Sequence, residues 1–207
     1  MITKINMLRE NEFAIKTIQD VMQSKGYAFF TNGEYNLNII GIRSGNQNAN
    51  SFDDWLLLCY KEKNVWLTRI YQITTDAGTY WLKNPMDKRG TAILVPNQYR
   101  GVYSIDKHLG KYDALCQRNG KVQTYRDNDK DKILDMDDST ITEGFYGINI
   151  HRSNPYHESV SVDKFSAGCQ VFANPKDFEQ FMTICKKSRD LYGNKFTYTL
   201  LLETDFN

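Results

Sequence analysis

The sequence predicts a β-rich α+β fold with a sandwich- or barrel-like core, an N-terminal helix and one C-terminal helix. Short apolar runs recur along the chain with Gly or Asn turns between them, which is typical of an all-β core. Aromatic residues make up 13% of the chain, and they favour strands. Helical periodicity is confined to residues 5–24 and 174–193.

The N-terminal part begins with an amphipathic helix over residues 5–24, whose apolar residues recur at helical spacing. Residues 27–43 then predict one or two strands split by a turn. The polar segment RSGNQNANSFDD, residues 43–54, is the best candidate for a boundary. We therefore expect an N-terminal helix and strand extension over residues 1–50 and a main domain over 51–207.

The main domain begins with a hairpin that turns near Lys63-Asn64, and further strand-like runs follow it: GTYWL, TAILV, GVYSI, GKVQTYR, GFYGINIH and CQVFA. A second helix has Asn174 as its N-cap, Pro175 at the first helical position and Gly193 at its end. A last strand, KFTYTLLLET, closes the domain.

Composition narrows the choice of partners and compartment. The net charge is +1, from 26 basic and 25 acidic residues, so we expect no nucleic-acid partner. The chain contains no run of 18 apolar residues, so we expect no membrane span. The first 23 residues are charged throughout and lack the apolar core of a secretory signal, so we expect synthesis in the cytosol. The four cysteines are then reduced thiols, three of them packing residues.

The stretch HRSNPYHESVSVDKFSAGCQVF, residues 151–172, combines Cys169 with a histidine that follows an apolar run. A cysteine nucleophile needs a base nearby, and His151 could supply it from a neighbouring strand. Gly168 would let the backbone approach a substrate closely. The alternative is structural: a buried cysteine after a glycine, and a surface histidine at a strand end. His108 is expected on the surface, in the turn DKHLGKY.

The order and spacing of these residues resemble the L,D-transpeptidase catalytic domain, over roughly residues 52–205. That family has a His after an apolar strand, then 14 to 17 residues, then Ser/Thr-His-Gly-Cys. Ile150-His151, the 14-residue gap and Ser166-Ala167-Gly168-Cys169 match this motif. Ala167 replaces the family's second histidine. Gln170 and Val171 stand where the family commonly has an Arg or Asn.

The resemblance implies a cysteine acyltransferase or peptidase that acts on peptidoglycan stem peptides and needs no cofactor for catalysis. His151 takes the thiol proton of Cys169, or holds a thiolate–imidazolium pair already formed, and the Arg152 carbonyl fixes the imidazole tautomer. The Ser166-Ala167-Gly168-Cys169 turn supplies backbone N–H groups to the oxyanion. Tyr146, His157 and Gln170 are expected to contact the substrate, and His157 is an alternative base.

A wall enzyme made in the cytosol must reach the wall or periplasm by another route. Release from a phage-infected cell, carriage on a virion or delivery by a secretion machine would each serve. Two other functions stay open. One is a catalytically degenerate binding or virion structural protein that retains the fold, and the other is a cysteine hydrolase acting on a different amide.

A second motif, DNDKDKILDMDD (residues 127–138), places carboxylates at the ligand positions of an EF-hand-type calcium loop. Lys132 occupies the position of the usual Gly, and an Asp replaces the final Glu. The alternative is a solvated acidic turn. The predicted ligands of a structural calcium ion are Asp127, Asp129, Asp131, the Ile133 carbonyl, Asp135 and Asp138.

Overall fold

The structure, a computed structural model, describes the backbone of residues 11–207 and the side chains from Ile15 onward. Its first helix, α2, spans Asn11–Ser24 and confirms that part of the expected helix over residues 5–24. The remaining part of that expected helix, residues 5–10, lies outside the described residues.

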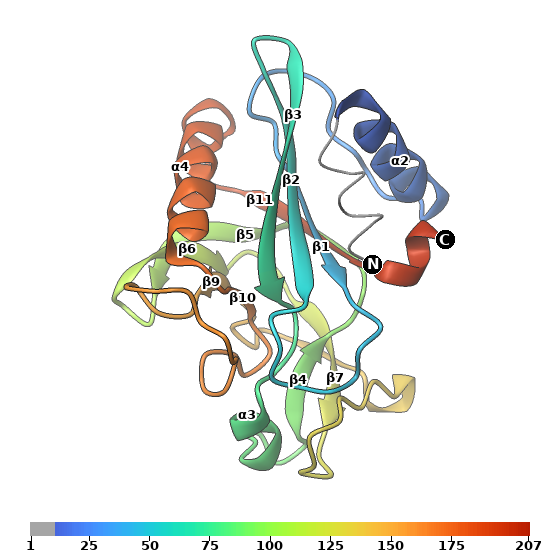
Figure 1. Ribbon diagram of the computed structural model, residues 1–207, viewed down its shortest axis with the longest axis vertical. Coiled ribbons are helices and arrows are strands. Elements are labelled where there is room, and N and C mark those ends of the chain that lie inside the picture. Colours follow the sequence, from blue (N-terminus) through green and yellow to red (C-terminus); the bar gives the residue numbers. More distant parts are fainter. Residues whose placement is uncertain (1–10) are drawn as a thin grey trace.

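Eight strands form a closed mixed barrel, which confirms the expected β-rich α+β class (Figure 1). Neighbouring strands are antiparallel except in the pairs β1–β11 and β9–β10, which are parallel. In order around the barrel the strands are β1 (Asn38–Arg43), β11 (Phe196–Leu202), β5 (Gln98–His108), β6 (Tyr112–Gln117), β9 (Ile150–Arg152), β10 (Gln170–Phe172), β3 (Val65–Thr74) and β2 (Asp54–Glu62).

β1 lies within the segment expected as an N-terminal extension, yet it is an integral barrel strand between β11 and β2. All six of its residues are buried. A smaller sheet, in the order β4 (Thr91–Leu94), β7 (Val122–Asp127) and β8 (Thr142–Gly144), lies below the barrel in Figure 1. Two short 3-10 turns, η1 (Asp138–Thr140) and η2 (Glu203–Phe206), complete the fold with the helices.

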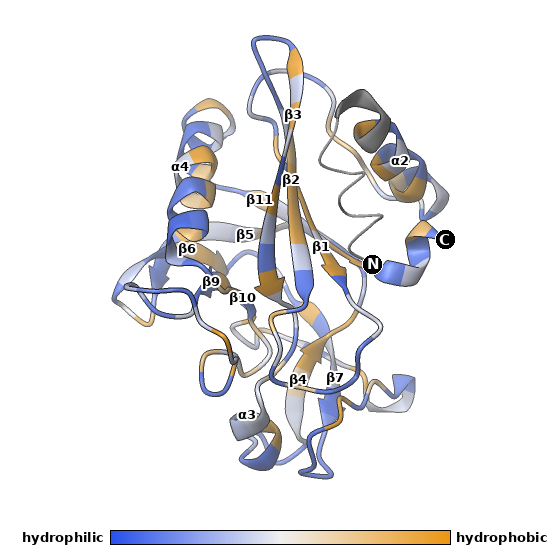
Figure 2. Ribbon diagram, viewed as in Figure 1, coloured by the Kyte–Doolittle hydropathy of each residue, from blue (hydrophilic) through white to orange (hydrophobic). Residues whose placement is uncertain are grey.

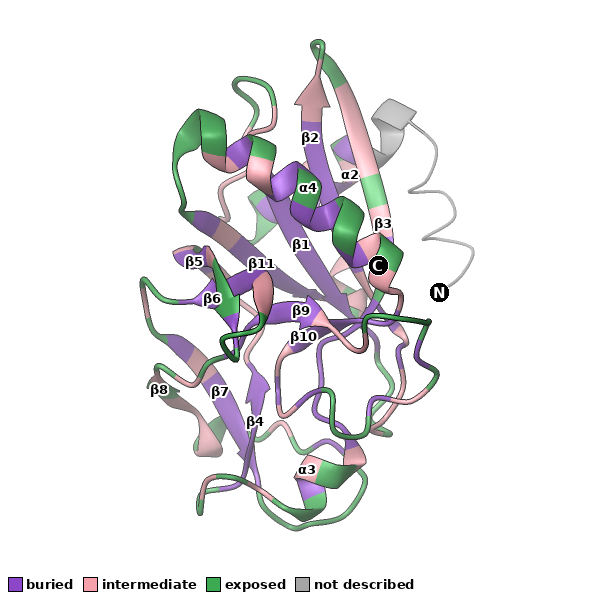
Figure 3. Cartoon of the chain, turned by 90° about the vertical axis from the view of Figure 1, so that its left-hand side faces the viewer, coloured by how far each residue is buried: buried purple, intermediate pink, exposed green. Residues whose placement is uncertain are grey.

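The two long helices cover the barrel from different sides (Figure 1). α2 packs Ile18 and Met22 against Leu57 and neighbouring residues of β1, β2 and β11. The second, α4 (Pro175–Tyr192), turns its apolar face toward the main core and its polar face outward (Figures 2 and 3). Its expected caps are confirmed: the Asn174 side chain accepts the Lys176 N–H at 2.9 Å. None of the described helices is long and apolar enough to cross a bilayer.

Two predicted strands are replaced by other structures. GTYWL forms a short helix, α3 (Thr79–Lys83), because the N–H groups of Trp81 and Leu82 both bond to the carbonyl of Gly78. GFYGINIH is mostly irregular, since only its ends belong to β8 and β9. The Gln117 side-chain oxygen accepts the backbone N–H groups of residues 146, 147 and 148 and so replaces a partner strand.

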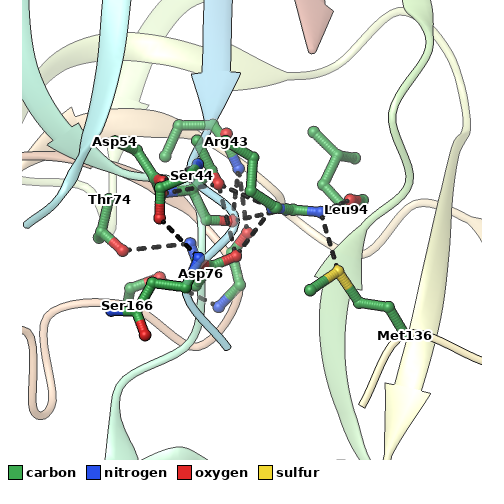
Figure 4. Close-up of polar contacts among 12 residues, drawn as sticks. Arg43, Ser44, Asp54, Thr74, Asp76, Leu94, Met136 and Ser166 are labelled. Carbon is green, nitrogen blue, oxygen red and sulfur yellow. Dashed lines mark hydrogen bonds and ion pairs between the residues drawn. The ribbon is translucent and has the colours of Figure 1, made fainter. Parts of the chain in front are cut away.

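A buried charge network joins the ends of the barrel strands to the smaller sheet (Figure 4). Arg43, 1% exposed, forms an ion pair with Asp76 at 2.9 Å. Its guanidinium also donates to the Thr75 hydroxyl at 2.9 Å and to the Leu94 carbonyl on β4 at 2.9 Å. Asp54 is fully buried and accepts the Thr75 hydroxyl at 2.8 Å. The Arg43 guanidinium thus pairs directly with Asp76 and is linked to Asp54 through the Thr75 hydroxyl.

The same network extends to the segment before Cys169. Asp54 accepts the backbone N–H groups of Ser44 at 2.7 Å and Thr75 at 2.6 Å. Two residues beyond Asp76, the Gly78 N–H donates to the Ser166 carbonyl at 2.9 Å. Burial raises the pKa of both Asp54 and Asp76, and for Asp54 the neighbouring Asp76 charge adds to this effect.

Replacing Arg43 with Met is expected to lower the free energy of unfolding by about 3–5 kcal/mol, because two buried carboxyl groups lose their counter-charge. The loss should be larger at pH 8 than at pH 5. Raised folded-state pKa values make stability fall as pH rises, and Arg43 lowers the pKa of both carboxyls. Removing Arg43 raises these pKa values further, so the variant loses more stability than the wild type between pH 5 and pH 8. Urea unfolding at both pH values measures it.

Lys16→Met is the matched control, since Lys16 pairs with Asp20 on the exposed face of α2. It should change the unfolding free energy by less than about 0.5 kcal/mol. Equal effects of the two substitutions would contradict the central role of Arg43.

Candidate active site

The turn before Cys169 is fixed by its own side chains and by β4. The Ser166 hydroxyl donates to the Cys169 carbonyl at 2.8 Å and accepts the Gly168 N–H at 3.2 Å. Gly168 has φ +115°, and a Cβ at this position would lie 2.2 Å from the carbonyl oxygen of Ala92. Only glycine combines this backbone conformation with this close approach. The turn therefore holds Cys169 in one position relative to β4.

The Cys169 thiol is partly buried between two backbone groups of the irregular segment after β8. Its sulfur accepts the Asn149 N–H at 3.4 Å and donates to the Gly147 carbonyl at 3.4 Å. Burial raises the pKa of this thiol to about 11. The thiol of the free protein is therefore neutral at neutral pH. This pKa does not agree with the alternative of a thiolate–imidazolium pair that is already formed.

His151 lies on β9, beside the strand that follows Cys169. β9 and β10 run parallel with His151 paired to Val171. Cys169 lies immediately before β10, and its side chain packs against the buried cluster that contains Val171, the partner of His151. The His151 Nδ1 lies 2.8 Å from the Arg152 carbonyl, which can only accept. The imidazole therefore carries its proton on Nδ1 and presents an unprotonated Nε2.

A second histidine lies against this imidazole. The rings of His108 and His151 stack with centroids 4.0 Å apart and an interplanar angle of 20°. His108 is buried, at the end of β5, and not on the surface as the sequence analysis expected. The reason is the β5–β6 hairpin, which pairs His108 with Tyr112 and turns both side chains toward β9.

Hydrogen bonding indicates a neutral His108 ring, and burial favours the neutral form of His151. Asn149 Oδ1 accepts the Gln117 N–H at 2.9 Å, so Asn149 Nδ2 is the donor to His108 Nδ1 at 3.1 Å. Burial, together with the adjacent His108, lowers the pKa of His151 to about 3. Burial also lowers the pKa of His108. Two stacked imidazolium ions would repel each other in this buried place.

The thiol and the imidazole share no direct hydrogen bond. Among the described residues, the Cys169 sulfur bonds to Gly147 and Asn149 and not to His151. In this resting state the proton has no direct path from sulfur to Nε2. Proton transfer therefore needs a small side-chain rotation or a bridging water.

A cavity of about 280 Å³ opens beside the turn that holds Cys169. Tyr146, Arg126 and Ala167 line it, together with Trp81, Thr91 and Phe145. The Arg126 guanidinium lies 4.2 Å from the centre of the Tyr146 ring, a cation–π contact. Ala167, two residues before Cys169, is the residue of the Ser166 turn that lines this cavity.

A larger groove of about 930 Å³ lies between α4, the β5–β6 turn and the loop after β9. Tyr112 forms its floor near His151 and donates to the Arg152 carbonyl at 3.2 Å. More basic than acidic side chains line the groove. The acidic ones are Asp113, Glu158 and Glu179, and the basic ones are Lys107, Lys111, Arg152, His157, Lys176 and Lys186. The groove therefore suits a ligand that carries carboxylates.

The structure places the remaining expected site residues differently from one another. Tyr146 and His157 each line one of the two depressions. Gln170 is fully buried inside the barrel, where it accepts the Tyr198 hydroxyl at 2.8 Å, so the expectation that it contacts substrate does not agree with its position. Ser166 is also fully buried and shapes the turn.

Four residues of the site were not found from the sequence: His108, Tyr112, Gln117 and Asn149. The signal in the sequence was the glycine-containing turn DKHLGKY. In the structure its Leu109 and Gly110 have positive φ values of 49° and 71°. Such a pair is typical of a tight hairpin, which would have paired His108 with Tyr112. The strand YDALCQ was missed, and with it this pairing.

The acidic motif is only partly brought together. Carboxylate oxygens of Asp127, Asp129 and Asp135 lie within 4.8 Å of one another. Asp131 is not in this group, and its Oδ1 accepts the Ile133 N–H at 2.6 Å. Asp138 lies apart from the group, at the start of η1. The backbone of Ile133 forms an isolated β-bridge with Asn48.

Comparison of the chain with protein-family models, with curated proteins and with solved structures found no match in any of the three.

Gly168→Ala is expected to destabilise the fold by about 3 kcal/mol or more, because the methyl group meets the Ala92 carbonyl at a positive φ. Gly26→Ala is the matched control: its φ is +70° and nothing lies within 4 Å of the added Cβ. That variant should lose only about 1–2 kcal/mol from backbone conformation. Similar losses in thermal unfolding would contradict the close approach at Gly168.

Alkylation of Cys169 by iodoacetamide should accelerate about tenfold per pH unit between pH 7 and 9, since only the thiolate reacts and the thiol pKa is about 11. Intact-mass spectrometry should find one label, because the other three cysteines are buried. Cys169→Ala should remove it. A rate that is already maximal below pH 7 would show a preformed ion pair instead.

Proposed function

We propose that the chain is a peptidoglycan-acting cysteine enzyme of the L,D-transpeptidase or L,D-carboxypeptidase type, with an L,D-transpeptidase-like barrel fold. One observation carries the proposal. β9 and β10 pair His151 with Val171, whose cluster Cys169 packs against, and Nδ1 of His151 is held by the Arg152 carbonyl. Nucleophilic acyl transfer by a cysteine requires a thiol and a general base that can take its proton.

In the proposed reaction, Nε2 of His151 takes the thiol proton as the Cys169 sulfur attacks the carbonyl of the third, diamino acid residue of a stem peptide. A sulfur–carbon bond forms and the amide carbon–nitrogen bond breaks. The leaving D-alanine amine receives the proton from His151. Water then releases the acyl group in a carboxypeptidase, and an amine takes it in a transpeptidase.

The oxyanion needs N–H donors that are not already used. The Gly168 N–H is occupied by the Ser166 hydroxyl, which removes one of the three donors expected from the sequence. Among the described residues, the N–H groups of Ala167 and Cys169 have no hydrogen-bond partner. In other enzymes, one such donor contributes roughly 3 kcal/mol to transition-state stabilisation.

The resting chemistry implies that substrate binding activates the thiol. The Cys169 thiol and the His151 imidazole are both neutral, and the sulfur bonds to backbone groups instead of to His151. A peptide bound over the sulfur would replace these weak contacts and exclude water, which strengthens the interaction between thiolate and imidazolium. The groove lined by Arg152 and the cavity lined by Ala167 supply room for such a peptide.

Turnover of purified muropeptides with tetrapeptide stems tests the proposal. Mass spectrometry should detect release of D-alanine or a cross-linked product, together with an acyl adduct on the intact protein. Cys169→Ala should abolish the adduct and reduce turnover at least about 10³-fold, and His151→Ala at least about 10²-fold.

Cys59→Ala serves as the control thiol, because Cys59 is buried in the cluster beneath α2. It should keep wild-type turnover. Activity that survives Cys169→Ala, or is lost equally in Cys59→Ala, contradicts the assignment.

The second candidate is a non-catalytic binding protein that retains the fold. The observation that favours it is the neutral thiol, which has no hydrogen bond to His151. In that case sedimentation with purified wall sacculi would persist in Cys169→Ala, and no wall fragment would be turned over.

A further inference from the structure

We propose that Asp127, Asp129 and Asp135 form a calcium site that joins the end of β7 to the loop after it. This inference is independent of the proposed catalysis. It starts from geometry, because one carboxylate oxygen of each residue lies within 4.8 Å of the other two. Three points this close fit around a centre no more than about 2.8 Å from each (4.8 Å divided by √3). Calcium–oxygen distances of about 2.3–2.6 Å need only a small closure of the loop.

A second observation points to a ligand for these oxygens. Asp127 is fully buried, and its Oδ1 has no hydrogen-bond partner. Its other oxygen accepts the Asp135 N–H at 3.0 Å, which fixes the carboxylate next to the other two acids. A buried oxygen without a partner is rare in native proteins and calls for an ion, a water or a proton.

The protein itself supplies no counter-charge. Among the described residues, no lysine, arginine or histidine forms an ion pair with any of the three carboxylates. Lys130 and Lys132 lie in the same loop but are exposed and make no ion pair with them. Burial, followed by the neighbouring acidic charges, raises the pKa of Asp127 to about 6. A bound cation would remove this repulsion.

The donor set indicates the class of cation. All three ligands are carboxylate oxygens, which bind hard cations. Asp129 and Asp135 are exposed, so waters can complete a shell of six to eight oxygens. This irregular loop suits calcium, because magnesium requires near-ideal octahedral geometry at shorter distances.

A cation here would stabilise more than its own loop. The Leu134 N–H donates to the Gln47 carbonyl at 2.8 Å, so the acidic loop is tied to the connection between β1 and β2. In that connection, the Asn50 side chain accepts the N–H groups of Asp163 at 2.6 Å and Thr79 at 3.3 Å. The site therefore supports the loops that surround the Ser166 turn.

The test is calorimetric titration of the full chain, stripped with EDTA, with CaCl2 and separately with MgCl2. We expect one calcium site, at least tenfold weaker magnesium binding, and a rise in Tm of about 3 °C or more at saturating calcium. Asp129→Asn and Asp135→Asn should each weaken calcium binding at least tenfold. Both residues are exposed, so these variants should fold.

Asp131→Asn and Asp138→Asn are the matched controls, since both belong to the same acidic stretch but not to the cluster. They should bind calcium within about threefold of the wild-type affinity. No heat and no Tm shift with calcium overturns the site, and magnesium binding of equal strength overturns its assignment to calcium. Equal weakening in all four variants overturns the three-residue assignment in favour of diffuse attraction.

Discussion

The ion pair between Arg43 and Asp76, with Asp54 beside it, is the constraint on which the rest of the structure depends. It brings together the end of β1, the start of β2, the end of β3 and the carbonyl of Leu94 on β4. These elements belong to both sheets. Because the charges are buried, each hydrogen bond must be made for the fold to be stable. The Ser166 turn is attached two residues beyond Asp76, so the site inherits its position from this network.

The proposed nucleophile and base are positioned by backbone pairing, and their chemistry is set by burial. The register of β9 against β10 pairs His151 with Val171, two residues after Cys169. Low polarity around both groups keeps them neutral, as the pKa of the thiol and that of the imidazole move in opposite directions. His108 adds to this effect by its stacking contact. The two side chains are thus positioned while both are neutral. In the proposed reaction, a bound substrate changes their surroundings so that the proton can move.

The sequence was informative where short-range rules determine the structure. The caps of α4 and the hairpin at Lys63-Asn64 follow from local preferences, and the structure confirms them. It was uninformative where a distant side chain replaces a local partner. The segment after β8 is irregular because Gln117, some 30 residues earlier, accepts its N–H groups. His108 was misplaced for a similar reason, since its burial depends on β9 and on the undetected strand β6.

The closure of the barrel by β1 and β11 has a consequence for how the chain folds. Ile39 is paired with Tyr198, so these partners are separated by most of the chain, whereas β1 and β2 are close neighbours in sequence. Contacts between distant segments form slowly, because loop entropy must be lost before they stabilise anything. During synthesis, β1 can pair with β2 early but has to wait for the last strand. Until then its second edge is open to other chains, and crowded conditions would favour intermolecular pairing.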